Sequence, residues 1–256
     1  MKKLTVEDFA KLREPQKLGG RSPSALANML ISYIILQAII FAIEYFAGVS
    51  FTNYPYNKEI LIVHFWIIVA HVILSIIFSI QAVFRKAERI QYLVYIVVNL
   101  NMFGVSFFIL ALFLLGSQEE NTGITQEFLL NYTYLALLIG LVVFVVAFLR
   151  YYLLLHKGHF RKGETKETLL ERLMDRLMLG PGFLIVGIGL VLIMLYLNEV
   201  AGFVEDRWMT MAPIFIGHLC FYATLFVLPE QIVVLYCKFR FKSFNFNIRG
   251  SLMSED

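Results

Sequence analysis

Charged residues are scarce in this chain. They make up 16% of its 256 residues, hydrophobic residues make up 59%, and the mean hydropathy is +0.72. Soluble domains carry about 25% charged residues, and a soluble core could not bury so much apolar surface. The composition therefore excludes an ordinary soluble domain and indicates a membrane protein. The net charge of +3 suits contact with anionic lipid, so we expect the lipid bilayer, and no nucleic acid, to be its partner.

The sequence also lacks the short motifs that mark catalytic and cofactor sites. It has no GxxxxGKS/T, HExxH or GxSxG motif and no CxxC pair. Its two cysteines, Cys220 and Cys237, are 17 residues apart, which is ~25 Å on one helix and beyond disulfide reach. Two helical turns, ~10.5 Å, separate His64 from His71, so the two cannot bind one metal ion. We therefore expect no enzyme, no cofactor and no metal site.

Lysine and arginine are distributed very unevenly along the chain. Cytoplasmic loops of membrane proteins carry an excess of these two residues. Four polar segments hold 20 of the 22 cations. Two other polar segments hold one cation each, Lys58 and Arg207. This alternation predicts six membrane crossings with both termini in the cytoplasm. The cation-rich segments are 2–21, 85–89, 150–176 and 238–249.

Six apolar runs fit this threading, and each is close to the ~20 residues needed to cross ~30 Å of hydrocarbon. We therefore expect an all-α polytopic membrane protein, in which residues 1–256 form a single membrane domain. The predicted spans are 25–48, 60–84, 90–115, 128–150, 179–198 and 208–231. The predicted cytoplasmic parts are 1–24, 151–178 and 232–256.

The last apolar run, Trp208–Cys237, is longer than one untilted crossing requires, because its 30 residues would extend ~45 Å as a helix. We expect Pro213 and Pro229 to bend this run and its end to lie along the membrane surface. The following residues, 238–242, alternate cation and aromatic, which favours an extended or interfacial segment.

The cytoplasmic loop 151–178 is predicted to contain a short amphipathic helix that begins at Thr168. Leucines recur there at helical spacing against charged residues, and Thr168 with Glu171 fits a capping box. We expect this helix to lie on the inner membrane surface or to dock on protein. Its candidate interface residues are Leu169, Leu170, Leu173 and Leu177.

Polar side chains deep in a membrane are costly and are the first candidates for function. Counted at 1.5 Å per residue from the span ends, four of them lie ~14 to 17 Å deep, near the midplane. They are His71, Asn99, Asn101 and His218. Two interpretations stay open. The four residues form a small polar site or a proton-conducting step, or they make hydrogen bonds that lock the helices together, each worth about 0.6–2 kcal/mol.

Two acids also accompany the apolar runs. Glu44 lies at the outer boundary of the first span, where it can reach water or His64 on the next helix. Glu230 follows Pro229 near the inner face. It belongs either to an ion site at a broken helix or to the membrane surface beside the basic tail.

The bias towards Ile, Phe, Lys and Asn resembles that of proteins from low-GC bacteria. Small six-span proteins of such bacteria without catalytic motifs often resemble immunity or accessory proteins that accompany secreted toxins or secretion machines. This resemblance implies a non-enzymatic protein of the bacterial cytoplasmic membrane that binds a membrane-acting toxin or a secretion component. The alternative is a small transporter or permease subunit built around His71, Asn99, Asn101 and His218.

Thiol labelling of single cysteines in intact cells tests the predicted threading. In a cysteine-free background, an impermeant reagent added outside should modify a cysteine at Asn121 or Glu205, because both positions lie in cation-poor segments. The same reagent should not modify a cysteine at Ser22, Gly163 or Ser254. External labelling at Gly163 would contradict the threading.

Overall fold

The computed structural model describes residues 5–13, 21–117, 124–161, 208–247 and 251–254. In these ranges the secondary structure is helical apart from one isolated bridge, Phe246 to Leu252. Five helices are long and apolar enough to span a membrane, as a polytopic all-α chain requires. They are α2 (Pro23–Ser50), α3 (Asn57–Ser79), the continuous stretch Glu88–Gly116, α7 (Gln126–His156) and α9 (Trp208–Arg240), whose apolar part is Ala212–Arg240. The predicted span 179–198 and the amphipathic helix with Leu169, Leu170, Leu173 and Leu177 lie outside the described residues.

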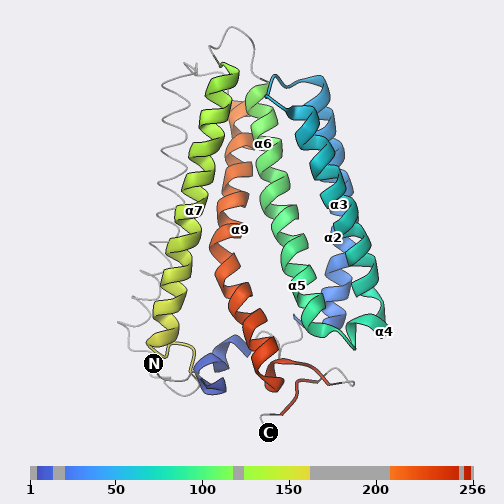
Figure 1. Cartoon of the computed structure of the whole chain (residues 1–256), viewed down its shortest axis with the longest axis vertical. Helices are drawn as coiled ribbons and strands as arrows, with labels where there is room; N and C mark the ends of the chain where they lie inside the picture. Colours follow the sequence, from blue (N-terminus) through green and yellow to red (C-terminus); the bar gives the residue numbers. More distant parts are fainter. Residues whose placement is uncertain (1–4, 14–20, 118–123, 162–207, 248–250, 255–256) are drawn as a thin grey trace.

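The stretch Glu88–Gly116 is the central helix of the described bundle. It consists of α5 (Glu88–Asn99), the π-helical turn η2 (Leu100–Val105) and α6 (Ser106–Gly116). In the most apolar 18 residues of this stretch 61% are buried inside the bundle, whereas 22–28% are buried in the corresponding segments of the other four described spans. Helices α2 and α3 pack on one side of it, α9 packs on the other, and α7 packs against α9 (Figure 1).

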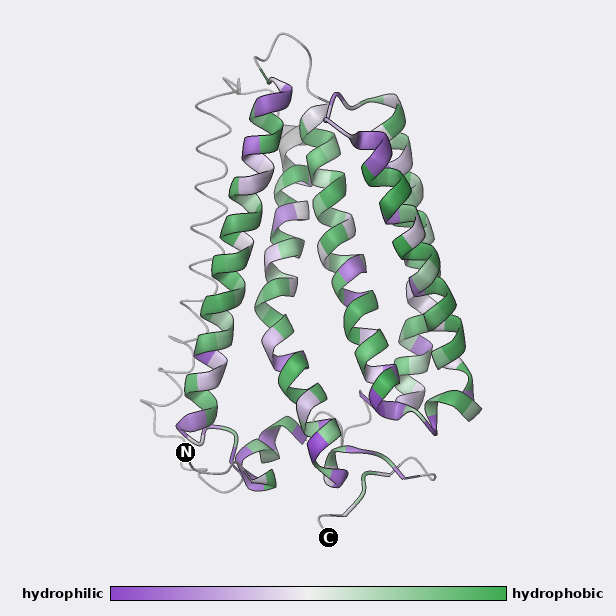
Figure 2. Cartoon of the chain, in the orientation of Figure 1, coloured by the Kyte–Doolittle hydropathy of each residue, from purple (hydrophilic) through white to green (hydrophobic). Residues whose placement is uncertain are grey.

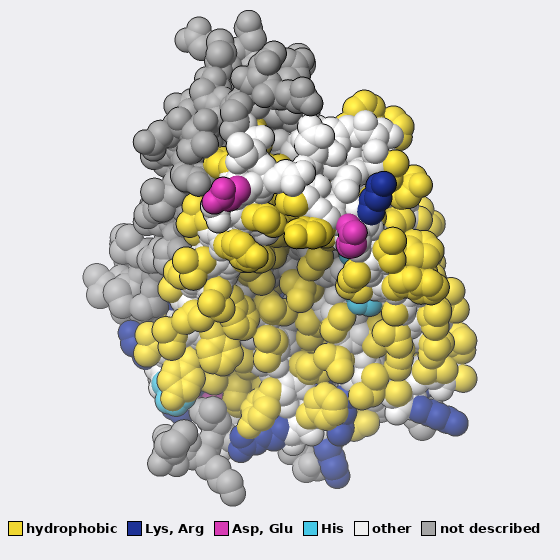
Figure 3. Space-filling model, turned by 45° about the horizontal axis from the view of Figure 1, so that its top comes forward, with side chains coloured by type: hydrophobic (Ala, Val, Ile, Leu, Met, Phe, Trp, Pro, Cys, Tyr) yellow, Lys and Arg dark blue, Asp and Glu magenta, His cyan; other side chains and the backbone are white. Residues whose placement is uncertain are grey.

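The outward faces of the bundle are strongly apolar. Trp66 is 64% exposed, Ile35 is 62% exposed and Tyr134 is 67% exposed, although all three lie within spanning helices. The middle of the bundle is hydrophobic, polar residues gather towards its ends, and most of the visible Lys and Arg side chains lie at one end (Figures 2 and 3). Apolar surface of this extent is stable only in contact with lipid, so the chain contacts the bilayer.

Side-chain caps set where two of the spans begin. The hydroxyl of Ser22 accepts a hydrogen bond from Ala25 N–H, and Pro23 occupies the first helical position, where its missing N–H costs nothing. Thr125 caps α7 in the same way by accepting from Phe128 N–H. Helix termini otherwise leave four backbone donors without a partner, so these caps favour helix starts near the predicted ones at 25 and 128.

The ends of three spans differ from the predicted ones by more than two residues. The fourth span, predicted to end at residue 150, continues as α7 to His156. The second span, predicted as 60–84, breaks at Ile80, whose backbone is extended (ψ 124°), and continues as the short helix α4 (Gln81–Phe84). The last span, predicted to end at Gln231, continues as helix to Arg240. Its final turns stay helical because Val234 and Cys237 are buried in a cluster with Tyr92. Lys238 therefore lies inside the bundle, where a surface position was predicted.

Helices α6 and α9 approach closely because a glycine lies between them. A Cβ atom at Gly217 would lie 2.6 Å from the carbonyl oxygen of Phe107 and 2.7 Å from Ala111 Cβ. Next to this contact the rings of Phe108 and Phe221 stack with centroids 4.5 Å apart. The contact matches the small-residue packing that spanning helices use in the absence of a hydrophobic driving force.

Both chain ends lie at the same end of the bundle (Figure 1). The N-terminal helix η1 (Val6–Arg13) lies against the end of α7, where Arg161 pairs with Asp8 at 2.6 Å and Lys11 N–H donates to Phe160 O. The backbone N–H of Thr5, together with the Arg161 guanidinium, lowers the pKa of the Asp8 carboxyl. The ring of Phe9 packs on Phe241 beyond the end of α9. This end of the bundle is therefore closed by its own termini.

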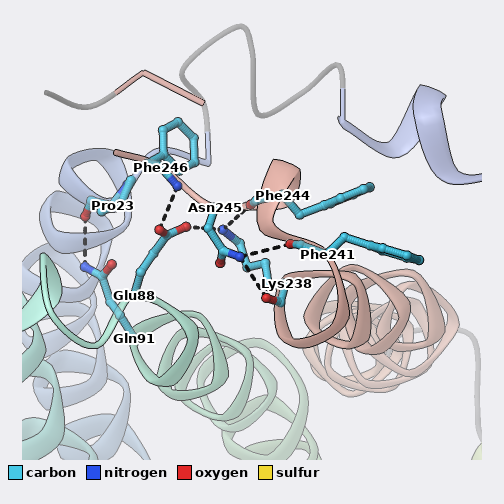
Figure 4. A network of polar contacts seen from close by, with 8 residues as sticks. All are labelled: Pro23, Glu88, Gln91, Lys238, Phe241, Phe244, Asn245 and Phe246. Carbon is cyan, nitrogen blue, oxygen red and sulfur yellow. Dashed lines mark hydrogen bonds and ion pairs between the residues drawn. The ribbon is translucent and has the colours of Figure 1, made fainter. Parts of the chain in front are cut away.

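A buried ion pair organises the same end of the bundle (Figure 4). Lys238 is 0% exposed, and its ammonium pairs with the carboxylate of Glu88 at the start of α5. The ammonium also donates to Phe244 O at 3.1 Å, in the 3₁₀ turn η5 (Lys242–Phe244). The second carboxylate oxygen of Glu88 accepts from Phe246 N–H at 2.8 Å. Asn245 adds bonds to the carbonyl oxygens of Lys238 and Phe241, so the tail is fixed to two spans.

Removal of the Glu88 charge should destabilise the bundle. Glu88→Gln leaves the buried Lys238 ammonium without its counter-charge, and we expect a loss of about 3–5 kcal/mol. Glu59→Gln is the matched control, because Glu59 is an exposed acid in the first turn of α3 and should cost less than about 1 kcal/mol. Thermal unfolding in detergent measures both. The double variant Glu88→Gln/Lys238→Met should regain part of the lost stability, because it no longer buries an unpaired charge. Equal stability of Glu88→Gln and Glu59→Gln would refute the role of the pair.

Candidate functional site

The most buried ionisable pair within the spans joins α2 to α3. Glu44 is 0% exposed and His64 is 2% exposed, and a carboxylate oxygen of Glu44 lies 2.7 Å from His64 Nδ1. On the other side of the imidazole, Nε2 faces the hydroxyl of Ser106 on α6 at 3.5 Å. The second oxygen of Glu44 is buried and has no hydrogen-bond partner. The expected reach from Glu44 to His64 is confirmed.

The antiparallel register of α2 and α3 places a second polar level two helical turns further in. The two helices run in opposite directions. The residue seven positions before Glu44 and the residue seven positions after His64 therefore lie at the same depth, ~10.5 Å along the bundle from the Glu44–His64 contact. The residues there are Gln37 and His71, both buried. Within the described part of the chain, both amide atoms of Gln37 and His71 Nδ1 lack hydrogen-bond partners.

A third level follows one turn deeper. Ser75 is fully buried on α3, and its hydroxyl has no hydrogen-bond partner. By the same register it lies level with Tyr33 of α2, whose hydroxyl donates to the side-chain oxygen of Asn99 on α5 at 3.2 Å. Further in, Ser79 donates to the carbonyl oxygens of Ser75 and Ala27.

The series of polar groups reaches both ends of the bundle. At the end of the bundle where the chain termini lie, the buried amide of Gln91 donates to the carbonyl oxygens of Pro23 and Phe78. At the opposite end, Asn57 donates to the carbonyl oxygen of Gly48, one turn beyond Glu44. We call this series the polar column. Its side chains are those of Asn57, Glu44, His64, Ser106, Gln37, His71, Tyr33, Ser75, Asn99, Ser79 and Gln91.

The structure separates the four residues of the predicted midplane site. His71 and Asn99 belong to the polar column. Asn101 is buried on the π-helical turn η2, and its amide nitrogen has no partner. His218 lies between α7 and α9, where Nε2 faces the hydroxyl of Tyr132 and Nδ1 faces the carbonyl oxygen of Ile214, each at 2.8 Å. Both nitrogens of His218 are thus satisfied, as in a structural histidine.

Seven of the eleven column side chains were not among the candidates from the sequence, and two of them are Gln37 and Ser75. A signal for these two existed, because Gln37 and Glu44 are seven residues apart, as are His64 and His71, and Ser75 follows one turn later. That spacing places each set on one helix face. Counting depth along single spans could not show that the faces of α2 and α3 meet. Two interpretations of Glu230 were open, and the structure shows it half-exposed and paired with Arg21 at 2.9 Å, near the end of the bundle where the chain termini lie.

The column offers hydrogen-bonding and proton-transfer chemistry. Imidazole, carboxylate, hydroxyl and amide groups lie along it, and most of them can both donate and accept a hydrogen bond. Across the described ranges, no three His, Cys, Asp or Glu side chains lie close enough to hold a metal ion. Comparison with known proteins finds no matching family model, no matching curated protein and no matching solved structure.

The structural assignment of His218 is tested by its partner. Tyr132→Phe removes the hydroxyl that satisfies His218 Nε2 in a fully buried position, and we expect a loss of about 1–3 kcal/mol in stability. Tyr134→Phe, on the same helix but 67% exposed, should change stability by less than about 0.5 kcal/mol. Unfolding in detergent compares the two. Equal stability of both variants would show that this hydrogen bond does not hold α7 to α9.

Proposed function

We propose that the protein is a small, non-enzymatic transporter or permease subunit of the bacterial cytoplasmic membrane, and that the polar column is its path. One observation carries the proposal: buried polar atoms of Gln37, Glu44, His71 and Ser75 have no hydrogen-bond partner among the described residues, although they lie within spanning helices. An unpaired polar group in hydrocarbon costs several kcal/mol, and the net stability of a whole domain is only about 5–15 kcal/mol. Water or a polar solute in the column removes that cost.

The proposal includes six spans with both termini in the cytoplasm. The end of α7 lies beside η1, and η1 also packs on the chain just beyond α9, so α7 and α9 end on the same side. Successive spans alternate in direction. One further crossing is therefore needed between α7 and α9, and the apolar run 179–198 supplies it. The cation-rich segments then all face the cytoplasm, in agreement with the positive-inside rule.

The immunity or accessory role stays a prediction from composition and size. It rests on the residue bias, the small size and the missing catalytic motifs, and the described residues do not test it. Equal toxin sensitivity of cells with and without the protein would remove it.

Cysteine accessibility tests the path without knowledge of the solute. In a background that lacks Cys220 and Cys237, cysteines replace Gln37 and Ser75 of the column, and Ile35 on the lipid-facing side of α2 serves as control. A charged, water-soluble thiosulfonate reacts only with a hydrated thiolate. We therefore expect the two column cysteines to react at least about tenfold faster than the control.

Detergent gel filtration confirms that each cysteine variant is folded before its rate is measured. Column cysteines that react as slowly as the Ile35 cysteine would mean that water does not enter the column. The transport proposal would then fall, and the polar groups would be structural contacts.

A further inference from the structure

The chemistry of the column narrows what it carries. We propose that the transported species is the proton, and that the Glu44–His64 pair is the site where it binds and is released. This inference rests on the proposed transport function and adds the substrate class to it. It depends on three properties of the described residues: the contacts of the pair, the sparse ligands at each level, and the continuity of the column.

The pair has the contacts that a proton relay requires. A proton that binds the Glu44 carboxylate can pass over the 2.7 Å contact to His64 Nδ1, which leaves the carboxylate ionised and the imidazole doubly protonated. The imidazole then loses the proton on Nε2 towards Ser106 or an adjacent water, and becomes neutral again. Return to the other tautomer readies it for the next proton. No bond other than those to the proton is formed or broken.

The levels of the column suit a proton better than a metal cation. A sodium, magnesium or calcium ion needs several oxygen ligands at one place, and calcium takes six to eight. The level of Glu44 offers one carboxylate and one hydroxyl beside an imidazole, and the level of Gln37 offers one amide oxygen beside another imidazole. A proton needs only one donor or acceptor at each step, which every level supplies.

Continuity of the column is the third property. His71, Ser75 and the Tyr33–Asn99 contact continue from the pair towards the inner end, and Ser79 lies one turn beyond Ser75. The proposal requires a chain of water molecules between levels that are ~10.5 Å apart. The unpartnered atoms of Gln37, His71 and Ser75 are the groups that would hold this water.

The ionisable side chains of the column are few. On α2 they are Glu44 and Tyr33, and on α3 they are His64 and His71, while α6 contributes the hydroxyl of Ser106. The charged residues of the first turn of α3 are exposed at the outer end. The described column thus holds one carboxylate and two imidazoles, so a proton at the pair meets no fixed cation beside it.

The order Ser106, His64, Glu44 also matches a nucleophile, its base and the carboxylate that orients the base. Acyl transfer needs, in addition, donors about 3 Å from the oxyanion that forms at the serine. The amide of Gln37, a buried donor without a partner, lies two turns away from Glu44 along α2, ~10.5 Å. The geometry therefore favours proton transfer, and serine chemistry becomes an outcome of the test.

The test measures proton flux into liposomes that contain the purified protein and the pH-sensitive dye pyranine. A potassium gradient with valinomycin supplies the driving force. Wild type should acidify the lumen faster than protein-free liposomes, Glu44→Gln should lower the protein-dependent rate at least about tenfold, and Glu44→Asp should keep part of it. Glu230→Gln is the matched control, because Glu230 is the other acid of an apolar helix but pairs with Arg21 outside the column. It should conduct like wild type.

Each outcome decides the proposal. Equal flux in wild type, Glu44→Gln and empty liposomes overturns it, and so does equal flux in wild type and Glu44→Gln at a rate above empty liposomes. If column cysteines are still accessible to the charged reagent, the transport function survives with another solute. Labelling of Ser106 by a fluorophosphonate, absent in Ser106→Ala, would assign the group to acyl transfer and likewise overturn the proposal. Gel filtration shows that the variants are folded.

Discussion

Hydrocarbon offers no hydrogen bonds, and the arrangement of this bundle follows from that constraint. The deeply placed polar side chains Glu44, His64 and Ser106 are turned inward and contact one another, while residues such as Trp66 face the lipid. The central stretch Glu88–Gly116 is the most buried span because it borders the column on one side and α9 on the other. Groups that find protein partners hold helices together. Groups without a described protein partner are the ones that the transport proposal assigns to water.

The same constraint gives the two buried acid–base pairs different characters. The Lys238 ammonium donates to the Glu88 carboxylate and to Phe244 O, and the second carboxylate oxygen of Glu88 accepts from Phe246 N–H. Both carboxylate oxygens of Glu88 thus have protein partners, and the pair fixes the tail to the bundle. The Glu44–His64 pair keeps an oxygen without a partner. His218 is like Glu88 in this respect, because both of its ring nitrogens have hydrogen-bond partners in the protein.

The sequence predicts what depends on composition along the chain, and misses what depends on helix rotation and distant contacts. Hydrophobic runs located the described spans, and neighbouring helices made the contact of Glu44 with His64 predictable. Depth alone grouped His218 with His71, because distance along a span carries no information about which neighbour a face meets. The helical end of α9 was missed for a similar reason. Lys238 is stable inside the bundle only because Glu88, 150 residues earlier, lies beside it.

Hydration of the column is the central claim, and magnetic resonance on histidine tests it most directly. In protein labelled with ¹⁵N histidine and embedded in lipid, magnetisation that starts on water should reach the imidazoles of His64 and His71. It should not reach His218, whose two nitrogens are bonded within the protein. Single histidine variants assign the signals. Transfer to His64 and His71 but not to His218 is the predicted result, and equal silence of all three imidazoles would contradict a water-filled path between α2 and α3.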